Sequence, residues 1–303
     1  MENMREFEKI LLGELPELKC MIDEPMTNHT TFRVGGPADL LVCPNRKELP
    51  IILALAKEHQ IPVTIIGNGS NLLVSDQGIR GLVIEIGKRM DDIEVEGTRL
   101  KAGAGALLSK AAQTAAGASL GGMEFAAGIP GSIGGAVVMN AGAYGGEIKD
   151  IIVNATVLDV NGNVQKLPKE ALDLSYRHSC IMDQNYYVVE AEFELYSKPE
   201  EEIRSVMAEL REKRMEKQPL EYPSAGSTFK RPEGFFAGKL IQDAGLRGYR
   251  VGDAQVSEKH CGFVINRGNA SAADILQLIH DVQQKVKETF GVTLETEVRI
   301  LGE

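Results

Sequence analysis

The sequence lacks any run of apolar residues that could cross a membrane, which takes about 18 in succession. It also lacks a secretion signal, because the N-terminal segment MENMREFEKILLGELPEL mixes acidic residues among its apolar ones and has no continuous apolar core. These two absences exclude an integral membrane protein and predict a cytoplasmic one.

Cysteine is scarce and histidine is scattered. Cys20, Cys43, Cys180 and Cys261 form no C-x-x-C pair, which is typical of a reduced cytosolic protein with buried thiols. The five histidines show no metal-ligand spacing, so we expect no metal. His260 precedes Cys261, but neighbours in a strand point to opposite faces, which argues against a thiolate–imidazole pair.

Positive charge is also in deficit, with 33 Lys and Arg against 43 Asp and Glu and a formal net charge of −10. This balance argues against nucleic-acid binding, which needs a basic surface. An anionic substrate would have to meet a local group of cations. Hydrophobic content of 43% is normal for a globular protein, and 303 residues suffice for two domains. No obligate protein partner is evident.

Glycine, by contrast, is concentrated in the segment GIPGSIGGAVVMNAGAYGG. It takes seven of the nineteen positions from Gly128 to Gly146, against the one or two expected at about 7%. Apolar residues such as Ile133 and Val137 run through the segment, unlike a flexible linker. Glycine allows close approach to the main chain, so the segment predicts a backbone wrapped around a ligand. A buried glycine-rich turn is the structural alternative.

A second glycine loop, Gly67-Asn68-Gly69-Ser70-Asn71, follows the predicted strand at 61–66. Successive exposed N–H groups in such a loop can bind phosphate oxygens. Leu72 stands where the dinucleotide fingerprint needs its third glycine, and no Walker A run exists. Two glycine loops far apart in sequence suit a long phosphate-bearing ligand such as a dinucleotide.

The pattern between residues 30 and 196 predicts a mixed α and β region. Asn45 and Glu48 resemble a capping box that opens a helix through His59. A strand is predicted at 82–86, a helix at 106–116, a hairpin at 151–167 around Asn161-Gly162-Asn163, and a strand over Tyr187–Leu195.

Composition changes at Ser197. Residues 199–217 predict a helix with acidic residues in its first turn and basic residues in its last. A further helix begins at Ser271, with Asp274 as its capping partner, and ends at Gly291. A final strand is predicted over Val292–Leu301, with one apolar and one polar face.

Four segments in order resemble a known family: GNGSNLLVSD, GIPGSIGGAVVMNAGAYG, YRHS at 176–179 and AGSTFKRP at 225–232. The chain is similar, from Asn28 to its end, to UDP-N-acetylenolpyruvoylglucosamine reductases, the MurB-type flavoenzymes of peptidoglycan synthesis. The resemblance implies an α+β protein with a two-part FAD-binding domain of the PCMH (vanillyl-alcohol-oxidase-like) type and a smaller α+β substrate-binding domain. It implies an N-terminal segment at 1–29, the FAD domain at 30–196 and the substrate domain at 197–303.

The resemblance also implies the reaction. NADPH reduces FAD, and flavin N5 then passes hydride to C3 of the enolpyruvyl group of a UDP-sugar. Arg177 binds the substrate carboxylate, Glu297 helps to stabilise the intermediate, and Ser227 gives a proton to C2. The short spacing between Arg177 and Lys217 places the chain with the subclass that lacks an extra tyrosine-bearing loop.

The other residues that the resemblance assigns fall into two groups. Those implied for FAD are Gly67, Asn68, Gly69, Ser70, Asn71, Leu72, Gly128, Pro130, Gly131, Ser132, Gly134, Gly135 and Gly142. Those implied for the substrate are Lys217, Tyr176, Lys230 and Arg231, with Arg247 and Arg250 as further candidates for its diphosphate.

The residues alone leave alternatives open. Arg177 could be a surface arginine, Ser227 a turn serine, Glu297 a solvated strand residue and Lys217 a lysine at a helix C-terminus. At the level of the protein, the alternatives are an FAD-dependent carbohydrate or alcohol oxidase, and a nucleotide-sugar binding protein without catalysis.

Overall fold

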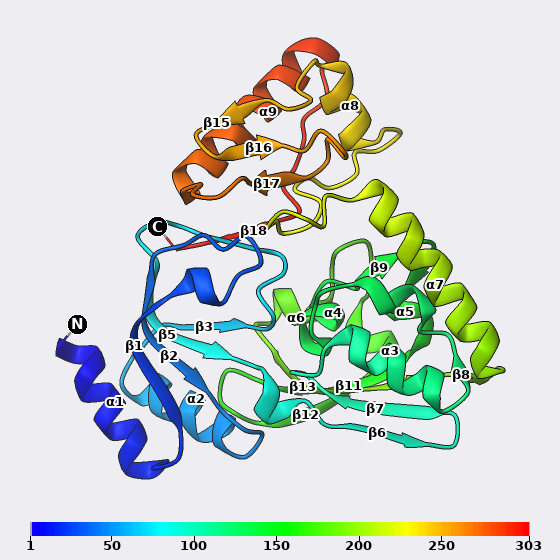
Figure 1. Ribbon diagram of the computed structural model, residues 1–303. Coiled ribbons are helices and arrows are strands. Elements are labelled where there is room, and N and C mark those ends of the chain that lie inside the picture. Colours follow the sequence, from blue (N-terminus) through cyan, green and yellow to red (C-terminus); the bar gives the residue numbers. More distant parts are fainter. Residues whose placement is uncertain (1, 303) are drawn as a thin grey trace. The chain divides into compact units, whose positions relative to one another are not determined.

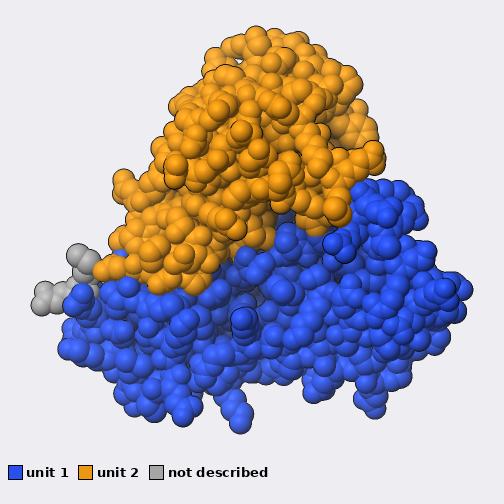
Figure 2. All heavy atoms as spheres, viewed as in Figure 1, with its two compact units in different colours: residues 1–22, 39–68, 81–213 blue, residues 23–38, 69–80, 214–303 orange. Residues whose placement is uncertain are grey.

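The computed structural model describes residues 2–302 (Figure 1). Its contacts divide the chain into two compact units, coloured separately in Figure 2. Unit 1 takes residues up to 22 together with 39–68 and 81–213, and unit 2 takes 23–38, 69–80 and 214–303. Each unit has its own apolar core. Among the described residues, none of the helices combines the length and the apolar character that crossing a bilayer requires.

The first sheet of unit 1 has four strands in the order β1-β2-β5-β3, with β3 and β5 parallel. Their bounds are β1 Lys19–Pro25, β2 Pro37–Cys43, β3 Val63–Ile66 and β5 Ile79–Glu85, and the helices beside them are α1 Glu2–Glu14 and α2 Glu48–Glu58. The predicted capping box before α2 is confirmed. The backbone N–H of Asn45 donates to Glu48 Oε2 at 2.8 Å, and Asn45 Oδ1 accepts from the backbone of Glu48 at 3.0 Å.

The second sheet of unit 1 has five antiparallel strands in the order β12-β11-β13-β7-β6. The strands are β6 Ile93–Glu96, β7 Arg99–Gly103, β11 Ile152–Leu158, β12 Val164–Pro168 and β13 Tyr187–Glu194. The helices α3 Leu108–Gly117 and α4 Ile133–Val138 lie on one face of this sheet (Figure 1). The predicted hairpin is confirmed, because β11 pairs with β12 from Asn154↔Pro168 to Leu158↔Val164.

Shorter elements complete unit 1. They are the strands β8 Leu120–Gly121, β9 Gly142–Ala143, β10 Gly146–Glu147 and β14 Tyr196–Ser197, the helices α5 Ile148–Ile151 and α6 Cys180–Asp183, and the 3-10 turns η2 Lys88–Met90, η3 Glu124–Gly128 and η4 Lys169–Leu172. The helix α7, Glu200–Lys217, begins in unit 1 and ends in unit 2.

Unit 2 is built on the three-stranded antiparallel sheet β15-β16-β17 and the helices α8 and α9. The bounds are β15 Arg250–Val251, β16 Ala254–Val256, β17 Val264–Asn266, α8 Ala237–Asp243 and α9 Ala272–Phe290, with η1 Met26–Asn28, β4 Leu72–Val74 and β18 Arg299–Leu301. The predicted capping box of Ser271 and Asp274 is confirmed, as is the left-handed C-cap at Gly291. Phe32 and Leu73 join this core from segments far earlier in the chain.

The prediction of a continuous last strand is wrong in extent. Only Arg299–Leu301 forms a strand, which pairs in parallel with β4. Residues 295–298 bond to the segment 228–230 through backbone hydrogen bonds and one isolated bridge instead of a ladder. Leu294 and Val298 are buried as predicted, whereas Ile300 is 45% exposed.

The sequence-based boundary at 197 precedes α7, whereas contacts divide the chain within α7, after Lys213. The contact grouping also assigns residues 23–38 and 69–80 to unit 2, because they pack on its core. The division into FAD and substrate domains at residue 197 stays a prediction.

Candidate active site

The two predicted glycine loops contact each other within unit 1. A Cβ atom on Gly67 would lie 2.3 Å from Ser132 Oγ, so a larger residue there would displace the Ser132 hydroxyl. Next to it, Asn68 Nδ2 donates to the carbonyl of Pro130 at 2.5 Å. Two segments more than 60 residues apart in sequence therefore form one surface.

The loop 103–107 supports the longer glycine segment from behind. The N–H of Ile133 donates to Ala106 O and that of Gly134 to Ala104 O, both at 2.8 Å. A Cβ on Gly134 would lie 3.1 Å from the Cβ of Ala104. On the outer side, Gly128, Pro130 and Gly135 are exposed. Small, exposed residues on a supported backbone fit a cofactor that approaches the main chain closely, as FAD requires.

The rest of the shorter loop belongs to unit 2. Gly69 has φ +60°, and a Cβ there would lie 1.9 Å from the carbonyl oxygen of His29, so the backbone requires glycine. Asn71 Nδ2 donates to Glu297 O at 3.0 Å, and Asn71 O accepts from the N–H of Arg299 at 2.9 Å. Leu72 begins β4. Asn71 therefore fixes the main chain of a predicted catalytic residue.

Arg177 occupies the tip of a tight turn in unit 1. Ser175 and His178 exchange two backbone hydrogen bonds of 3.2 Å, and Tyr176 and Arg177 lie between them. Arg177 has φ +56°, a left-handed conformation that is uncommon for any residue other than glycine. Its Cζ lies 5.3 Å from the ring centroid of Tyr176. Backbone strain of this kind costs roughly 1–3 kcal/mol and concentrates at functional sites.

Asn140 supports this turn, and the sequence analysis missed it. Its Nδ2 donates to Glu147 Oε2 at 2.8 Å and to the carbonyl of Ser175 at 3.0 Å, and its Oδ1 accepts from the N–H of Lys149 at 2.9 Å. Asn140 is 1% exposed and has φ +40°. The only signal in the sequence was an asparagine inside an otherwise small and apolar segment.

Glu147 is a stable carboxylate. The hydrogen bond from Lys149 lowers its pKa, and further lowering comes from the bond with Asn140 and from the charges of Lys149 and Arg177. The Lys149 Nζ atom lies 2.9 Å from Glu147 Oε2. Glu147 also caps α5 in a capping box with Asp150.

Ser227 and Glu297 lie on two adjacent segments of unit 2. Ser227 bridges to Phe263, and the N–H of its neighbour Thr228 donates to Gly262 O at 2.9 Å. On the other side, the N–H of Glu297 donates to Thr228 O at 2.8 Å. Thr228 itself is 1% exposed, and its Oγ1 accepts from the N–H of Val264 at 3.0 Å. The structure thus places these two predicted residues on segments whose backbones are hydrogen-bonded to each other.

The predicted substrate cations of unit 2 have varied surroundings. Lys217 is exposed at the end of α7, and Lys230 pairs with Glu295 at 3.1 Å. The guanidinium of Arg231 lies 4.0 Å from the ring centroid of Phe236. Lys259, which the sequence analysis did not select, donates to Met215 O at 2.6 Å near the same helix end.

The two further diphosphate candidates are engaged locally. Arg247 donates to Glu258 O and, at 2.7 Å, to Gln242 Oε1. Arg250 pairs with Asp253 at 3.0 Å. Both would have to exchange these bonds to bind phosphate.

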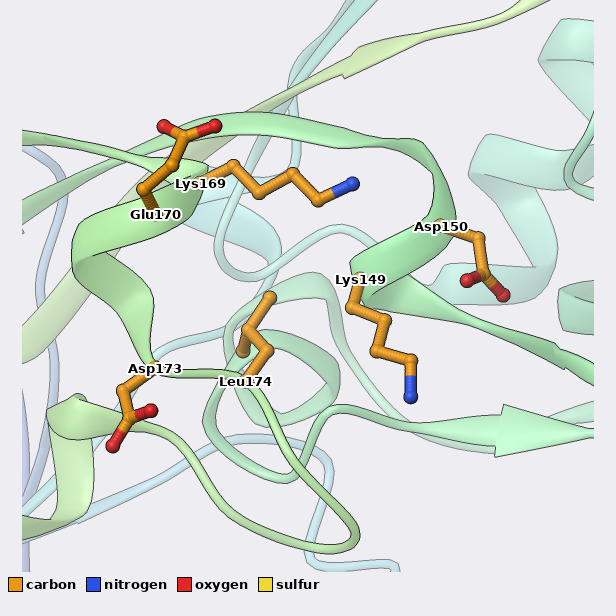
Figure 3. A pocket seen from close by; sticks show the side chains of 6 residues that line it. All are labelled: Lys149, Asp150, Lys169, Glu170, Asp173 and Leu174. Carbon is orange, nitrogen blue, oxygen red and sulfur yellow. The ribbon is translucent and has the colours of Figure 1, made fainter.

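A pocket of about 380 Å³ lies elsewhere on unit 1 (Figure 3). Its lining comes from α5, η4 and the loop after η4, and consists of Lys149, Asp150, Lys169, Glu170, Asp173 and Leu174. Two lysines and three acids give it no clear preference for an anion, and it contains none of the predicted site residues. We do not assign the cofactor or the substrate to it.

His260 and Cys261 do not form a catalytic pair. Burial lowers the pKa of His260, whose Nδ1 accepts from the N–H of Gly262 at 3.1 Å and whose ring packs edge-on against Phe263. Burial raises the pKa of the Cys261 thiol. A protonated thiol is a poor nucleophile. In the part of the chain that the structure describes, no three metal-ligating side chains come together.

Two family models match separate parts of the chain. Residues 37–168 match an FAD binding domain, and residues 218–301 match the C-terminal domain of UDP-N-acetylenolpyruvoylglucosamine reductase. A reductase of that name from Agathobacter rectalis is 60% identical, over 98% of each chain. The chain belongs to the UDP-N-acetylenolpyruvoylglucosamine reductase family. It is an FAD-containing oxidoreductase of peptidoglycan synthesis that uses NADPH.

Two other members extend the comparison. The reductase of Lachnoclostridium phytofermentans is 54% identical over 97% of this chain and 98% of its own. The crystal structure of the Thermus caldophilus reductase (MurB) superposes with a TM-score of 0.81 at 36% identity, covering 94% of this chain and 99% of that chain. The expected fold class, a PCMH-type FAD domain followed by the reductase C-terminal domain, is confirmed. Membership in the family sets aside the oxidase and the non-catalytic binding protein.

Proposed function

We propose that this chain reduces UDP-N-acetylenolpyruvoylglucosamine to UDP-N-acetylmuramate in the cytoplasm, with Arg177, Ser227 and Glu297 as its catalytic residues. The observation that best supports the role of Arg177 is its left-handed backbone at the tip of a turn that the buried Asn140 holds. Backbone strain of this kind is concentrated at functional sites.

The glycine surface of unit 1 would hold the FAD. Gly67, Asn68 and Pro130–Gly135 form it, and the small side chains there leave the main chain accessible. We propose Gly69, Ser70, Asn71, Leu72, Gly128 and Gly142 as further FAD-binding residues. When bound, FAD supplies the hydride that reduces the enolpyruvyl double bond at C3.

Arg177 would bind the substrate carboxylate. The guanidinium fork can donate two parallel hydrogen bonds to a carboxylate. Negative charge that develops at C2 spreads into that carboxylate, so Arg177 would stabilise the transition state more than the ground state. Glu297 would complete the polar environment of the intermediate. Loss of one preorganised donor of this kind costs about 10²–10³ in rate.

Ser227 would give its proton to C2. A serine hydroxyl is a weak acid, so it can act only on a strongly basic centre within hydrogen-bond reach. The backbone bonds on both sides of Thr228 fix Ser227 and Glu297 on neighbouring segments, which suits a proton donor that must be placed accurately.

Lys217, Tyr176, Lys230 and Arg231 would contact the rest of the substrate. The chain is acidic overall, so local cations near residues 217–231 would supply the attraction for an anionic UDP-sugar. The net negative charge of the chain also argues against nucleic-acid binding. We propose that the protein acts without membrane attachment and without an obligate protein partner.

The test is NADPH oxidation by the FAD-loaded protein with and without enolpyruvyl-UDP-N-acetylglucosamine. We expect consumption of NADPH that depends on the substrate, with one UDP-N-acetylmuramate formed per NADPH. Consumption that depends on oxygen alone, or no consumption, would contradict the assigned substrate.

A further inference from the structure

We propose that Asn140 is a positioning residue for Arg177, and that it acts with the carboxylate of Glu147. This inference rests on the proposed role of Arg177 in binding the substrate carboxylate. Asn140 needs no contact with substrate or cofactor in this role, because it acts through the turn that carries the arginine.

The amide of Asn140 is held from three directions. Its nitrogen donates to Ser175 O at the base of the turn and to Glu147 Oε2, and its oxygen accepts from the N–H of Lys149. The side chain is also 1% exposed, so water cannot replace these partners. A reversed amide would set its oxygen against the Ser175 carbonyl and the Glu147 carboxylate. Only one orientation satisfies all of the bonds.

The other end of the turn is tied to the same segment. Ser179 Oγ donates to Val138 O at 2.7 Å, and Ser179 is fully buried. Val138 ends α4, and Asn140 follows it by two residues. The turn that bears Arg177 is thus fixed at both ends to the glycine segment that we assign to FAD. The segment that we assign to the cofactor and the turn that bears the substrate arginine are therefore hydrogen-bonded to each other within unit 1.

Glu147 connects Asn140 to the charge of Arg177. Arg177 is near enough to lower the pKa of the Glu147 carboxyl, and Lys149 and Asn140 lower it further. The carboxylate would limit the positions of the guanidinium while Asn140 limits those of the main chain below it. Asn140 would thus restrain the backbone at Arg177, and Glu147 would restrain the position of its guanidinium.

The test compares Asn140→Asp with Asn154→Asp. Asn154 is a matched control, because its Nδ2 also donates to a carboxylate, Glu192, at 2.6 Å, but it lies on β11 of the five-stranded sheet. Both variants set one carboxylate against another, and both should lower Tm. Aspartate tolerates the left-handed backbone at position 140.

Only Asn140→Asp should slow the reoxidation of NADPH-reduced flavin by substrate, by about 10²-fold, the cost of a misplaced catalytic group. The rate at which NADPH bleaches the flavin should stay at the parent value. If Asn140→Asp does not give a folded flavoprotein, Asn140→Gly, which also tolerates φ +40°, takes its place. A folded position-140 variant with the parental reoxidation rate overturns the inference.

Arg177→Lys separates this inference from the proposed function, because lysine keeps the charge and loses the fork. A normal reoxidation rate in Arg177→Lys removes the proposed role of Arg177 and the inference with it. If reoxidation is slow in Arg177→Lys but normal in the Asn140 variant, the inference about Asn140 is overturned and the proposed role of Arg177 stands. In the Arg177→Lys background, we expect the Asn140 substitution to add little, since both changes impair the same contact.

Discussion

At the scale of single residues, the contact between Gly67 and Ser132 shows how one missing Cβ shapes a surface. The position has no left-handed backbone, so its glycine is explained by the close approach of Ser132. The two loops meet there, and an added Cβ, 2.3 Å from Ser132 Oγ, would displace that hydroxyl.

We therefore expect Gly67→Ala to weaken FAD retention. The displaced Ser132 hydroxyl would alter the surface that faces the cofactor, and we expect the Kd for FAD to rise about tenfold, which corresponds to about 1.4 kcal/mol. Flavin released on dilution, followed by fluorescence, measures the effect. Gly117→Ala is the matched control, since nothing lies within 4 Å of a Cβ at that helix end. Equal retention in both variants would contradict the role of the contact.

A second residue-scale prediction concerns Ser227. In Ser227→Ala, NADPH should still bleach the flavin, because the hydroxyl is assigned only to the protonation of C2. Reoxidation by substrate should fall by about 10²-fold or more, as for loss of a general acid. Stopped-flow absorbance follows the two steps separately. The control is Ser205→Ala on the exposed surface of α7, which should leave the rates of both steps unchanged. A parental turnover rate in Ser227→Ala would exclude Ser227 as the proton donor.

At the scale of elements, a polar cluster crosses four strands of the five-stranded sheet. The Glu192 carboxylate on β13 accepts from Arg99 on β7 at 2.6 Å, from Asn154 on β11 at 2.6 Å and from Lys166 on β12 at 3.3 Å. The bond from Arg99 is the main cause that lowers the pKa of Glu192 to about 2, with Asn154 next. The Glu192 carboxylate therefore connects side chains from three other strands, whereas each backbone ladder joins only two strands.

We expect Glu192→Gln to destabilise the protein by about 1 kcal/mol at neutral pH, a value reduced for partial solvent screening. A depressed pKa stabilises the fold above the unfolded-state pKa, near 4.5, and this contribution is lost as pH falls toward 2. The difference between variant and parent should therefore shrink between these values. Urea unfolding at several pH values measures it, with Glu212→Gln on exposed α7 as control. A difference that is constant down to pH 2 contradicts the argument.

Local sequence signals predicted most elements because their causes are local. The caps of α2 and α9 follow from side chains within a few residues of each helix start. The predicted last strand was too long because its alternation reflects burial of Leu294 and Val298, whereas its ladder depends on the length of β4, 227 residues earlier. Asn140 escaped prediction for the same reason, since its partner Ser175 is 35 residues away.

At the scale of the whole molecule, all four thiols are shielded. Burial raises the pKa of Cys43 to about 12, with the charge of Glu85 as the next cause, and that of Cys20 to about 11. The thiols of Cys180 and Cys261 are also raised by burial. The expectation of buried thiols is confirmed for Cys180 and Cys261, whereas Cys20 and Cys43 are only half-buried.

The native protein should therefore react with iodoacetamide at neutral pH at least about a hundredfold more slowly than its urea-unfolded form, whose thiols have pKa values near 8.5. The rate should rise only as pH approaches the raised values, because the thiolate is the reactive form. Mass spectrometry of the alkylated peptides assigns each cysteine. If a cysteine of the native protein reacts as fast as it does in the unfolded chain, the pKa of its thiol is not raised by the fold.

The sequence predicted two domains but not the composition of unit 2. Residues 23–38 and 69–80 contribute Phe32, Val34 and Leu73 to its core, although their neighbours in sequence belong to unit 1. Hydrophobic periodicity describes which residues are buried, and it does not say in which core. The catalytic roles came from the resemblance, because the residues alone favour a turn serine at 227 and a solvated strand glutamate at 297.

The pairing of β18 with β4 bears on the order in which the protein forms during translation. The strand that pairs with β4 is Arg299–Leu301, 227 residues after it in the sequence. At about 5–20 residues per second, ribosomes complete this strand more than ten seconds after they have made β4. Until then β4 has no partner for its parallel pairing, and Asn71 lacks Glu297 and Arg299, to which it bonds in the folded protein. The β4 segment therefore takes its final place late in synthesis, after the other residues of its core have been made.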